Sequence, residues 1–280
     1  MPHQLFLWLP ERFSSNGKVI DIGANLTHKS FDHDIDAVIQ RSLDVGIEKI
    51  IVTVSSIQDT KKAIELTDQY PNVLWATAGV HPHNAKTAEE RTEIMLKQLL
   101  AHQKIVAVGE IGLDYCRNFS EPKEQKKVFE IQLGVAAEKS LPVFLHQRDS
   151  HQDFVGILKD YKSSLTGGVA HCFTEGVKEL KDYLDLGLYI GITGWLCDPR
   201  RNHNLIDSIK YIPIDRLLIE TDSPYLLPKA LEKELKTRRN EPCFLPHIAR
   251  AIAEYKKTDL AEVLLNTIQN SEKLFFRQKQ

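Results

Sequence analysis

Short apolar runs alternate with amphipathic helical patterns along most of the chain, and this alternation restricts the possible folds more than any other feature. The apolar runs end abruptly in glycine or polar residues, as strands buried on both faces do. The predicted strands cover residues 19–25, 49–54, 73–80, 105–112, 142–146, 168–173, 188–194 and 216–222. The first helix begins after Asp32 or Asp34 and stops at Gly46. The other predicted helices cover about residues 58–70, 88–102, 121–139, 150–161, 176–185, 203–209, 246–256, 259–268 and 270–277.

Strict alternation of strand and helix implies parallel strands, and eight such units close into a (β/α)8 TIM barrel. The 280 residues suffice for one barrel of about 250 residues. A doubly wound open sheet is the alternative, but no Gly-x-Gly-x-x-Gly turn follows the first strand. Because no linker or change of composition interrupts the pattern, we predict a single domain over residues 19–280.

Residues 1–18 are expected to form an N-terminal extension before this domain. Their apolar segment 5–9 is short, lacks a basic flank and precedes Pro10, so a signal peptide is not expected. No apolar run approaches the roughly 20 residues of a membrane span. The four cysteines are far apart and form no CxxC pair, which favours free thiols in a reducing compartment. We therefore expect a cytoplasmic protein.

The net charge of −2 excludes a strong overall basic field, although nucleic acid could still bind locally. Polar residues gather instead where the predicted strands end. The segment Ile105–Asp114 shows this most clearly, because four apolar residues lead directly into Gly109, Glu110, Gly112 and Asp114. A carboxylate at the end of a buried strand is costly unless a cation or a donor lies beside it.

Other strand ends repeat the pattern. Asn25 ends the first strand, His81 and His83 end the third, and Arg148 follows the fifth. Glu110, His146, His171 and Asp222 stand at equivalent ends of the fourth, fifth, sixth and eighth strands, and Glu220 is also near the last of these ends. In a barrel these ends surround one mouth. Each residue alone could be structural, but together they predict a site for Mg²⁺, Mn²⁺ or Zn²⁺.

Seven segments together resemble the TatD family of metal-dependent deoxyribonucleases, in the branch called TatD proper. They are GVHPH (79–83), GEIGLD (109–114), PVFLHQRD (142–149), HCF (171–173), GITGW (191–195), LIETDSPYL (218–226) and RRNEP (238–242). The resemblance extends from about residue 19 to the end. It implies a TIM barrel that hydrolyses phosphodiester bonds, often as a Mg²⁺-dependent 3′-to-5′ exonuclease on single-stranded DNA or RNA. An association with DNA repair also comes with this family.

The resemblance implies Glu110, His146, His171 and Asp222 as metal ligands, with Mg²⁺ as the expected ion and Mn²⁺ or Zn²⁺ as alternatives. The family also has a His-x-His pair on the first strand, where this chain has Gly23 and Asn25. The resemblance to TatD proper implies that Gly-x-Asn is a feature of the branch. One or two ions are therefore expected.

In the mechanism that this site implies, the metal binds water and the scissile phosphate. Glu110 and Asp222 are the predicted catalytic residues, with Asp222 both a ligand and a general base. The predicted substrate contacts are His81, His83, Arg148, Asn25 and Arg239. For Arg239 an ion pair with Glu241 is an equal alternative. Trp195 and Tyr225 could stack on a base, although packing is the commoner role of such residues.

Two other functions fit the same residues. The site could polarise the carbonyl of an ester or amide, as in an aminoacyl-tRNA deacylase. Alternatively, a barrel without the His-x-His pair could bind nucleic acid without turnover. The predicted substrate is single-stranded DNA or RNA, no membrane partner is expected, and we expect a monomer.

Overall fold

The computed structural model describes residues 19–89, 91–235 and 237–276. Eight strands form one sheet in sequence order. Their bounds are β1 Val19–Ala24, β2 Ile47–Val52, β3 Leu74–Ala78, β4 Ile105–Asp114, β5 Val143–Arg148, β6 Gly168–Ala170, β7 Tyr189–Ile192 and β8 Leu217–Ile219. A parallel bridge between Ala24 and Ser223 joins the end of β1 to the chain after β8. The first and last strands are therefore neighbours, and the predicted (β/α)8 TIM barrel is confirmed.

Helices separate the strands as the periodicity predicts. Their bounds are α1 Ile35–Asp44, α2 Ile57–Gln69, α3 Thr92–Leu99, α4 Pro122–Lys139, α5 His151–Tyr161, α6 Val177–Asp185, α7 His203–Ile209, α8 Lys229–Leu235, α9 Leu245–Lys256 and α10 Leu260–Phe275. Short 3-10 helices are η2 Lys29–Phe31, η3 Pro82–Thr87, η4 Gly194–Cys197, η5 Ile214–Arg216 and η6 Pro242–Phe244.

Three helix predictions were wrong in detail. The segment 88–102 yields only α3, because the chain first forms η3, which begins with Pro82. Helix α8 lies between residues 222 and 246, where no helix was predicted. The two helices predicted at 259–268 and 270–277 are one helix, α10. Asn270 does not interrupt α10, because its amide donates to the carbonyls of Ile214 and Leu217.

The described chain divides into two compact units. The first comprises residues 19–51, 172–177 and 191–272, and the second comprises residues 52–171, 178–190 and 273–276. The single domain stays a prediction. The extension predicted at residues 1–18 lies outside the described residues.

A buried polar cluster organises the first unit where β1 and β8 end. The Asp21 carboxylate accepts hydrogen bonds from the backbone N–H groups of Gly23 and Thr221, at 3.2 and 3.0 Å. The Thr221 hydroxyl donates to the other carboxylate oxygen at 2.5 Å. These bonds hold the segment that carries Asp222 against β1.

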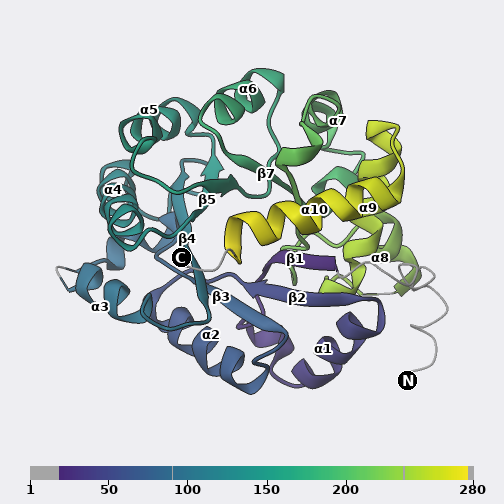
Figure 1. Cartoon of the computed structure of the whole chain (residues 1–280), viewed down its shortest axis with the longest axis horizontal. Helices are drawn as coiled ribbons and strands as arrows, with labels where there is room; N and C mark the ends of the chain where they lie inside the picture. The colour runs from purple at the N-terminus through teal and green to yellow at the C-terminus, as the bar shows by residue number, and fades with distance from the viewer. Residues whose placement is uncertain (1–18, 90, 236, 277–280) are drawn as a thin grey trace. The chain divides into compact units, whose positions relative to one another are not determined.

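In the second unit, parallel strands β3 to β6 are paired side by side. Helices α2 to α5 lie on the outer side of β3, β4 and β5 (Figure 1). Gly109 allows β4 and β5 to approach closely, because a Cβ there would lie 2.5 Å from that of Phe144. Gly112 has a φ of +143° and directly opposes His146. Both glycines therefore sit where β5 brings His146 toward β4.

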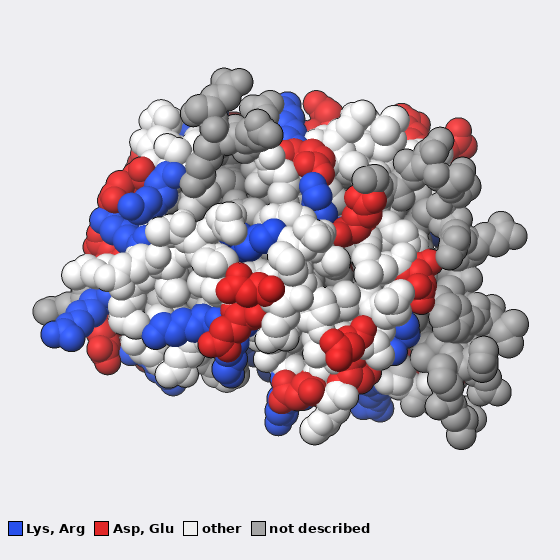
Figure 2. All heavy atoms as spheres, turned by 60° about the horizontal axis from the view of Figure 1, so that its bottom comes forward, with Lys and Arg blue, Asp and Glu red and all other residues white. Residues whose placement is uncertain are grey.

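The surface carries both signs of charge. On the face drawn in Figure 2, acidic and basic side chains are interspersed, as the small net charge leads one to expect. All four cysteines are free thiols, which confirms that prediction. Within the described ranges, no helix combines the length and the apolarity needed to cross a membrane.

Candidate metal centre

Strands β3 to β6 of the second unit place polar side chains at their carboxyl ends. Glu110 lies in β4 and His146 in β5, while His81 lies shortly after β3 and His171 directly after β6. Glu110, His81 and His171 are buried, and His146 is half-buried. Neighbouring parallel strands end at the same rim, which brings these four side chains together.

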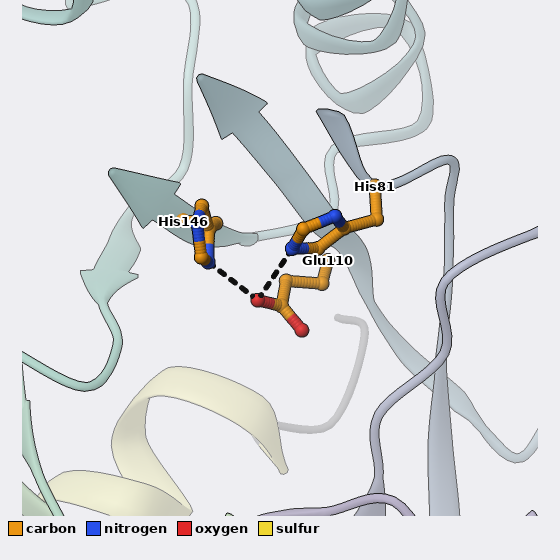
Figure 3. Close-up of side chains that lie close together, drawn as sticks. All are labelled: His81, Glu110 and His146. Carbon is orange, nitrogen blue, oxygen red and sulfur yellow. Dashed lines mark hydrogen bonds and ion pairs between the residues drawn. The ribbon is translucent and has the colours of Figure 1, made fainter. Parts of the chain in front are cut away.

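Three imidazoles surround one oxygen of Glu110. The Oε1 atom lies 2.7 Å from Nε2 of His171, 2.9 Å from Nδ1 of His146 and 3.3 Å from Nε2 of His81. Figure 3 shows the rings of His81, from the segment after β3, and of His146, from β5, reaching this oxygen. The structure thus brings together three of the four predicted metal ligands, and it places His81 beside them.

The imidazoles determine the charge of Glu110. Burial by itself raises the pKa of the Glu110 carboxyl, but the electrostatic effect of His171 and His81 and hydrogen bonds from His146 and His171 outweigh it. The pKa is therefore held well below its ordinary value, and the side chain is a carboxylate at neutral pH. Burial lowers the pKa of His81 to about 4 despite the attraction of Glu110, so His81 is neutral.

A second carboxylate, Asp114, supports the cluster from β4. Its Oδ2 atom lies 3.1 Å from Nε2 of His146 and 2.8 Å from Nε2 of His83. Its Oδ1 atom accepts a hydrogen bond from the backbone N–H of Arg117 at 2.8 Å. Gln125 binds both backbone polar groups of Asp114, at 2.8 and 3.0 Å. Hydrogen bonds thus hold both carboxylate oxygens and both backbone polar groups of Asp114.

Asp114 and His146 also shift each other's pKa. Burial raises the pKa of Asp114, but the hydrogen bonds that its carboxylate accepts from His146, His83 and the Arg117 backbone lower it well below its ordinary value. Burial lowers the pKa of His146, but Asp114 and Glu110 outweigh that effect and raise it. His146 therefore lies between two carboxylates, one on each ring nitrogen.

The ring contacts show how this cluster fits a metal ion. A metal-binding histidine commonly donates its other ring N–H to a carboxylate. A metal ion bound between His146 and Glu110 would replace the proton that Nδ1 shares with Glu110, while the Nε2–H stays directed at Asp114. The ligand-type atoms of His81, Glu110 and His146 lie within 4.8 Å of one another. Imidazole and carboxylate together suit Mn²⁺ and Zn²⁺, and the carboxylate also suits Mg²⁺.

His81 has a different hydrogen-bond role from His146. Its Nδ1 atom accepts the backbone N–H of His83 at 3.0 Å, so the proton of the neutral ring is on Nε2. That N–H points toward Glu110. The contacts of His81 therefore favour a hydrogen-bond donor over a metal ligand.

Asp114 was expected among the polar residues that end the predicted strand, but it was not among the predicted site residues. The even spacing of Glu110 and Asp114 was a signal for it, because residues two apart in a regular strand share a face. In the structure the register of β4 with β5 shifts between Gly109 and Ile111, so this alternation is interrupted at Glu110. What the pattern could not show is that His83 and His146 both meet Asp114.

Asp222 and Asn25 lie in the first unit, and they are in contact. The Asn25 amide donates to Oδ1 of Asp222 at 2.9 Å, and the backbone N–H of Asp222 donates to the carbonyl of Gly23. Asn25, which stands in place of the second histidine of His-x-His, therefore orients the carboxylate of Asp222. That Asp222 completes the ligand set stays a prediction.

The two predicted phosphate-binding arginines have different surroundings. Arg148 ends β5, where it pairs in register with Asp114. The guanidinium of Arg239 binds both oxygens of Asp34 at 2.7 and 2.8 Å, as well as Glu241 and the Ser30 carbonyl. The ion pair with Glu241 that the sequence left open is therefore present.

The family model described as TatD related DNase matches residues 20–276. The chain belongs to this family. A TatD protein of Edwardsiella piscicida, named 3′-5′ ssDNA/RNA exonuclease TatD, is 46% identical over 259 residues, which cover 92% of this chain and 99% of that relative. The family resemblance inferred from the seven motifs is thereby confirmed.

Solved TatD structures show the same fold. A hydrolase TatD family protein from Entamoeba histolytica is 33% identical, with a TM-score of 0.84, and the match covers 93% of this chain and 98% of that one. The TatD homologue YJJV from Escherichia coli K12 is 28% identical, with a TM-score of 0.83 and coverage of 92% and 98%.

Proposed function

We propose that this chain is a divalent-metal-dependent nuclease that hydrolyses phosphodiester bonds, acting 3′ to 5′ on single-stranded DNA or RNA. One observation carries the proposal. In a member of the TatD related DNase family, three imidazoles converge on one oxygen of a buried glutamate at the strand ends. Relatives that match nearly the whole chain are named as exonucleases of this kind.

In this proposal Glu110, His146 and His171 hold the metal ion, and Asp222 is the fourth ligand. Mg²⁺ is the proposed ion. When bound, the ion lowers the pKa of a water molecule and neutralises charge that develops on the phosphate. The contacts of Glu110 with both histidines and of Asp114 with His146 support the first three ligands.

The proposed proton acceptor is Asp222. The Asn25 amide holds one oxygen of Asp222 and thereby fixes the plane of the carboxylate. A base with a fixed orientation removes a proton from an attacking water more effectively than a mobile one. Asn25 is therefore proposed to act through Asp222 as well as on the substrate.

Neutral His81 is proposed to donate a hydrogen bond from Nε2 to a phosphate oxygen. His83 and Arg148 are proposed to contact the same substrate. His83 is held by Asp114. The planar guanidinium of Arg148 matches the geometry of phosphate oxygens. Arg239 was predicted to contact the substrate. Its ion pairs with Asp34 and Glu241 fix the loop that carries it, and we propose that Arg239 contributes to substrate binding by holding this loop in position.

Assays with end-labelled single strands test the function. The purified protein should release nucleotides from the 3′ end in Mg²⁺, and EDTA should abolish this release. Asp222→Asn and Glu110→Gln should each lower kcat by about 100-fold or more, since removing a metal ligand or base forfeits several kcal/mol of transition-state stabilisation. Glu130→Gln, on the exposed side of α4, is the matched control.

Two outcomes would replace the proposal. Hydrolysis of aminoacyl-tRNA without cleavage of single strands would indicate an ester hydrolase. Binding of single strands without turnover in Mg²⁺, Mn²⁺ or Zn²⁺ would indicate a non-catalytic barrel. Wild-type activity of Asp222→Asn would remove Asp222 from the mechanism.

The cytoplasmic location and the monomeric state are kept as proposals, as is a part in DNA repair. The free thiols of all four cysteines support a reducing compartment. Size-exclusion chromatography with light scattering tests the oligomeric state directly.

A further inference from the structure

Phe119 is an exposed aromatic residue beside the metal centre. It lies in the loop between β4 and α4 and is 55% exposed. Its ring centroid is 4.9 Å from that of His83, with the ring planes at 75°. His83 in turn contacts Asp114, which contacts His146. One histidine thus separates the phenyl ring from the carboxylate that supports a metal ligand.

The loop that carries Phe119 is anchored on both sides. The backbone N–H of Arg117 donates to Asp114 at 2.8 Å. The buried Ser120 hydroxyl accepts the backbone N–H of Lys86 and donates to the carbonyl of His83, both at 3.0 Å. Because these bonds already order the loop, a ligand that binds to the exposed Phe119 ring causes little further loss of conformational entropy.

Cationic residues flank this ring in the second unit. Arg117 and Lys86 are exposed, the first two residues before Phe119 and the second bonded to its neighbour Ser120. Aromatic rings interspersed with cations are the usual means by which proteins hold single strands, since bases stack on the rings and phosphates meet the cations.

We propose that Phe119 is a substrate-binding residue that stacks on a nucleobase of the single strand being cleaved. The inference rests on the proposed nuclease function and adds the contact with the base. A base held in a duplex is already stacked on both faces, so this contact favours strands whose bases are unpaired. Stacking requires only a π face, so DNA and RNA should benefit alike.

The test pairs variants of Phe119 with substrates that lack single bases. Phe119→Leu keeps an apolar side chain but removes the π face, whereas Phe119→Trp keeps the π face. On an intact oligonucleotide, Phe119→Leu should raise KM about tenfold and Phe119→Trp should match the wild type. A tetrahydrofuran abasic site is then placed in turn at the last, second-last and third-last nucleotide. At one of these positions, the base that stacks on Phe119 is missing, and wild type and Phe119→Leu should have equal KM values.

Tyr211→Leu is the matched control, because Tyr211 is 57% exposed but lies between α7 and β8, in a loop on the side opposite the strand carboxyl ends. This variant should keep the wild-type KM. The inference is overturned if Phe119→Leu keeps the wild-type KM, or if its loss is the same at every abasic position.

A binding measurement separates this inference from the proposed function. Single strands with 2-aminopurine near the 3′ end are titrated in EDTA, where stacking on an aromatic ring quenches the probe. Quenching by wild type and Phe119→Trp but not by Phe119→Leu supports the contact, even if no strand is cleaved in Mg²⁺. Cleavage with equal quenching by all three proteins leaves the nuclease function intact and overturns the role of Phe119.

Discussion

The Oδ2 atom of Asp114 lies 3.1 Å from Nε2 of His146, on the opposite edge of the ring from Glu110. A carboxylate at this position orients the ring and makes its other nitrogen a better ligand. Asp114 is almost completely buried, and His83, Arg117 and Gln125 hold it in place. In the proposed metal centre, Asp114 therefore supports the ligand His146 without having to touch the ion.

Asp114→Asn should weaken metal binding by about 10- to 100-fold, because the amide can present an N–H where His146 needs an acceptor. Isothermal titration with Mn²⁺ measures the affinity. Asp153→Asn, at a half-buried aspartate that binds Tyr115 and Lys126, is the control and should keep the wild-type affinity. Unchanged affinity of Asp114→Asn would show that Asp114 does not support the ligand set.

Divalent metal should stabilise the wild-type fold, because the ion binds the folded chain and not the unfolded one. At a concentration 100 times Kd the expected gain is about 2.7 kcal/mol. Glu110→Gln should lose most of this gain, since the glutamine oxygen is uncharged, whereas Glu130→Gln should keep it. Thermal unfolding with and without Mn²⁺ measures the shift, and equal shifts in all three proteins would exclude Glu110 as a ligand.

Gly109→Ala should disturb both folding and metal binding. A Cβ at this position would lie 2.5 Å from the Cβ and 2.7 Å from the carbonyl oxygen of Phe144, so β4 and β5 must separate. Overpacking of this kind costs about 1–3 kcal/mol or more, and it moves Glu110 relative to His146. The readouts are urea denaturation and Mn²⁺ affinity.

A matched glycine shows whether this effect is local. Gly134 lies in α4, where an added Cβ meets nothing within 4 Å. Gly134→Ala should raise stability by about 0.5–1 kcal/mol through helix propensity and leave metal affinity unchanged. If Gly109→Ala behaves like Gly134→Ala, the close approach of the two strands does not hold the site.

Asp21 should make stability depend on pH. Burial raises the pKa of this carboxyl from 3.8 to about 7, although hydrogen bonds from Thr221 and Gly23 oppose the shift. Between pH 4 and 7 the folded state binds more protons than the unfolded state, so stability falls as pH rises. The full loss is at most about 4 kcal/mol, and it is reached above the folded pKa.

Asp21→Asn should remove this dependence, because the amide stays neutral and its oxygen still accepts both backbone N–H groups. The variant should gain stability relative to wild type as the pH rises from 4 to 8, measured by urea denaturation at each pH. The exposed Asp32→Asn should follow the wild-type curve. Parallel curves for Asp21→Asn and wild type would show that Asp21 is ionised throughout.

The sequence alone determined the succession of strands and helices, because apolar runs and helical periodicity are local properties. It also placed Glu110, His146 and His171 at strand ends, where parallel topology makes them converge. The error at α10 has a tertiary cause, since the amide of Asn270 is bound by carbonyls more than 50 residues away instead of capping a helix end.

The tertiary structure alone decided what each polar side chain does. Arg239 pairs with Asp34, which is 205 residues away, and Asp114 lies between His83 and His146, 31 and 32 residues away in opposite directions. His81 turns its Nε2–H toward Glu110 because its Nδ1 atom accepts a backbone N–H. Such roles depend on the distances and angles between side chains that are far apart in the sequence. Residue type and spacing along the chain do not specify these.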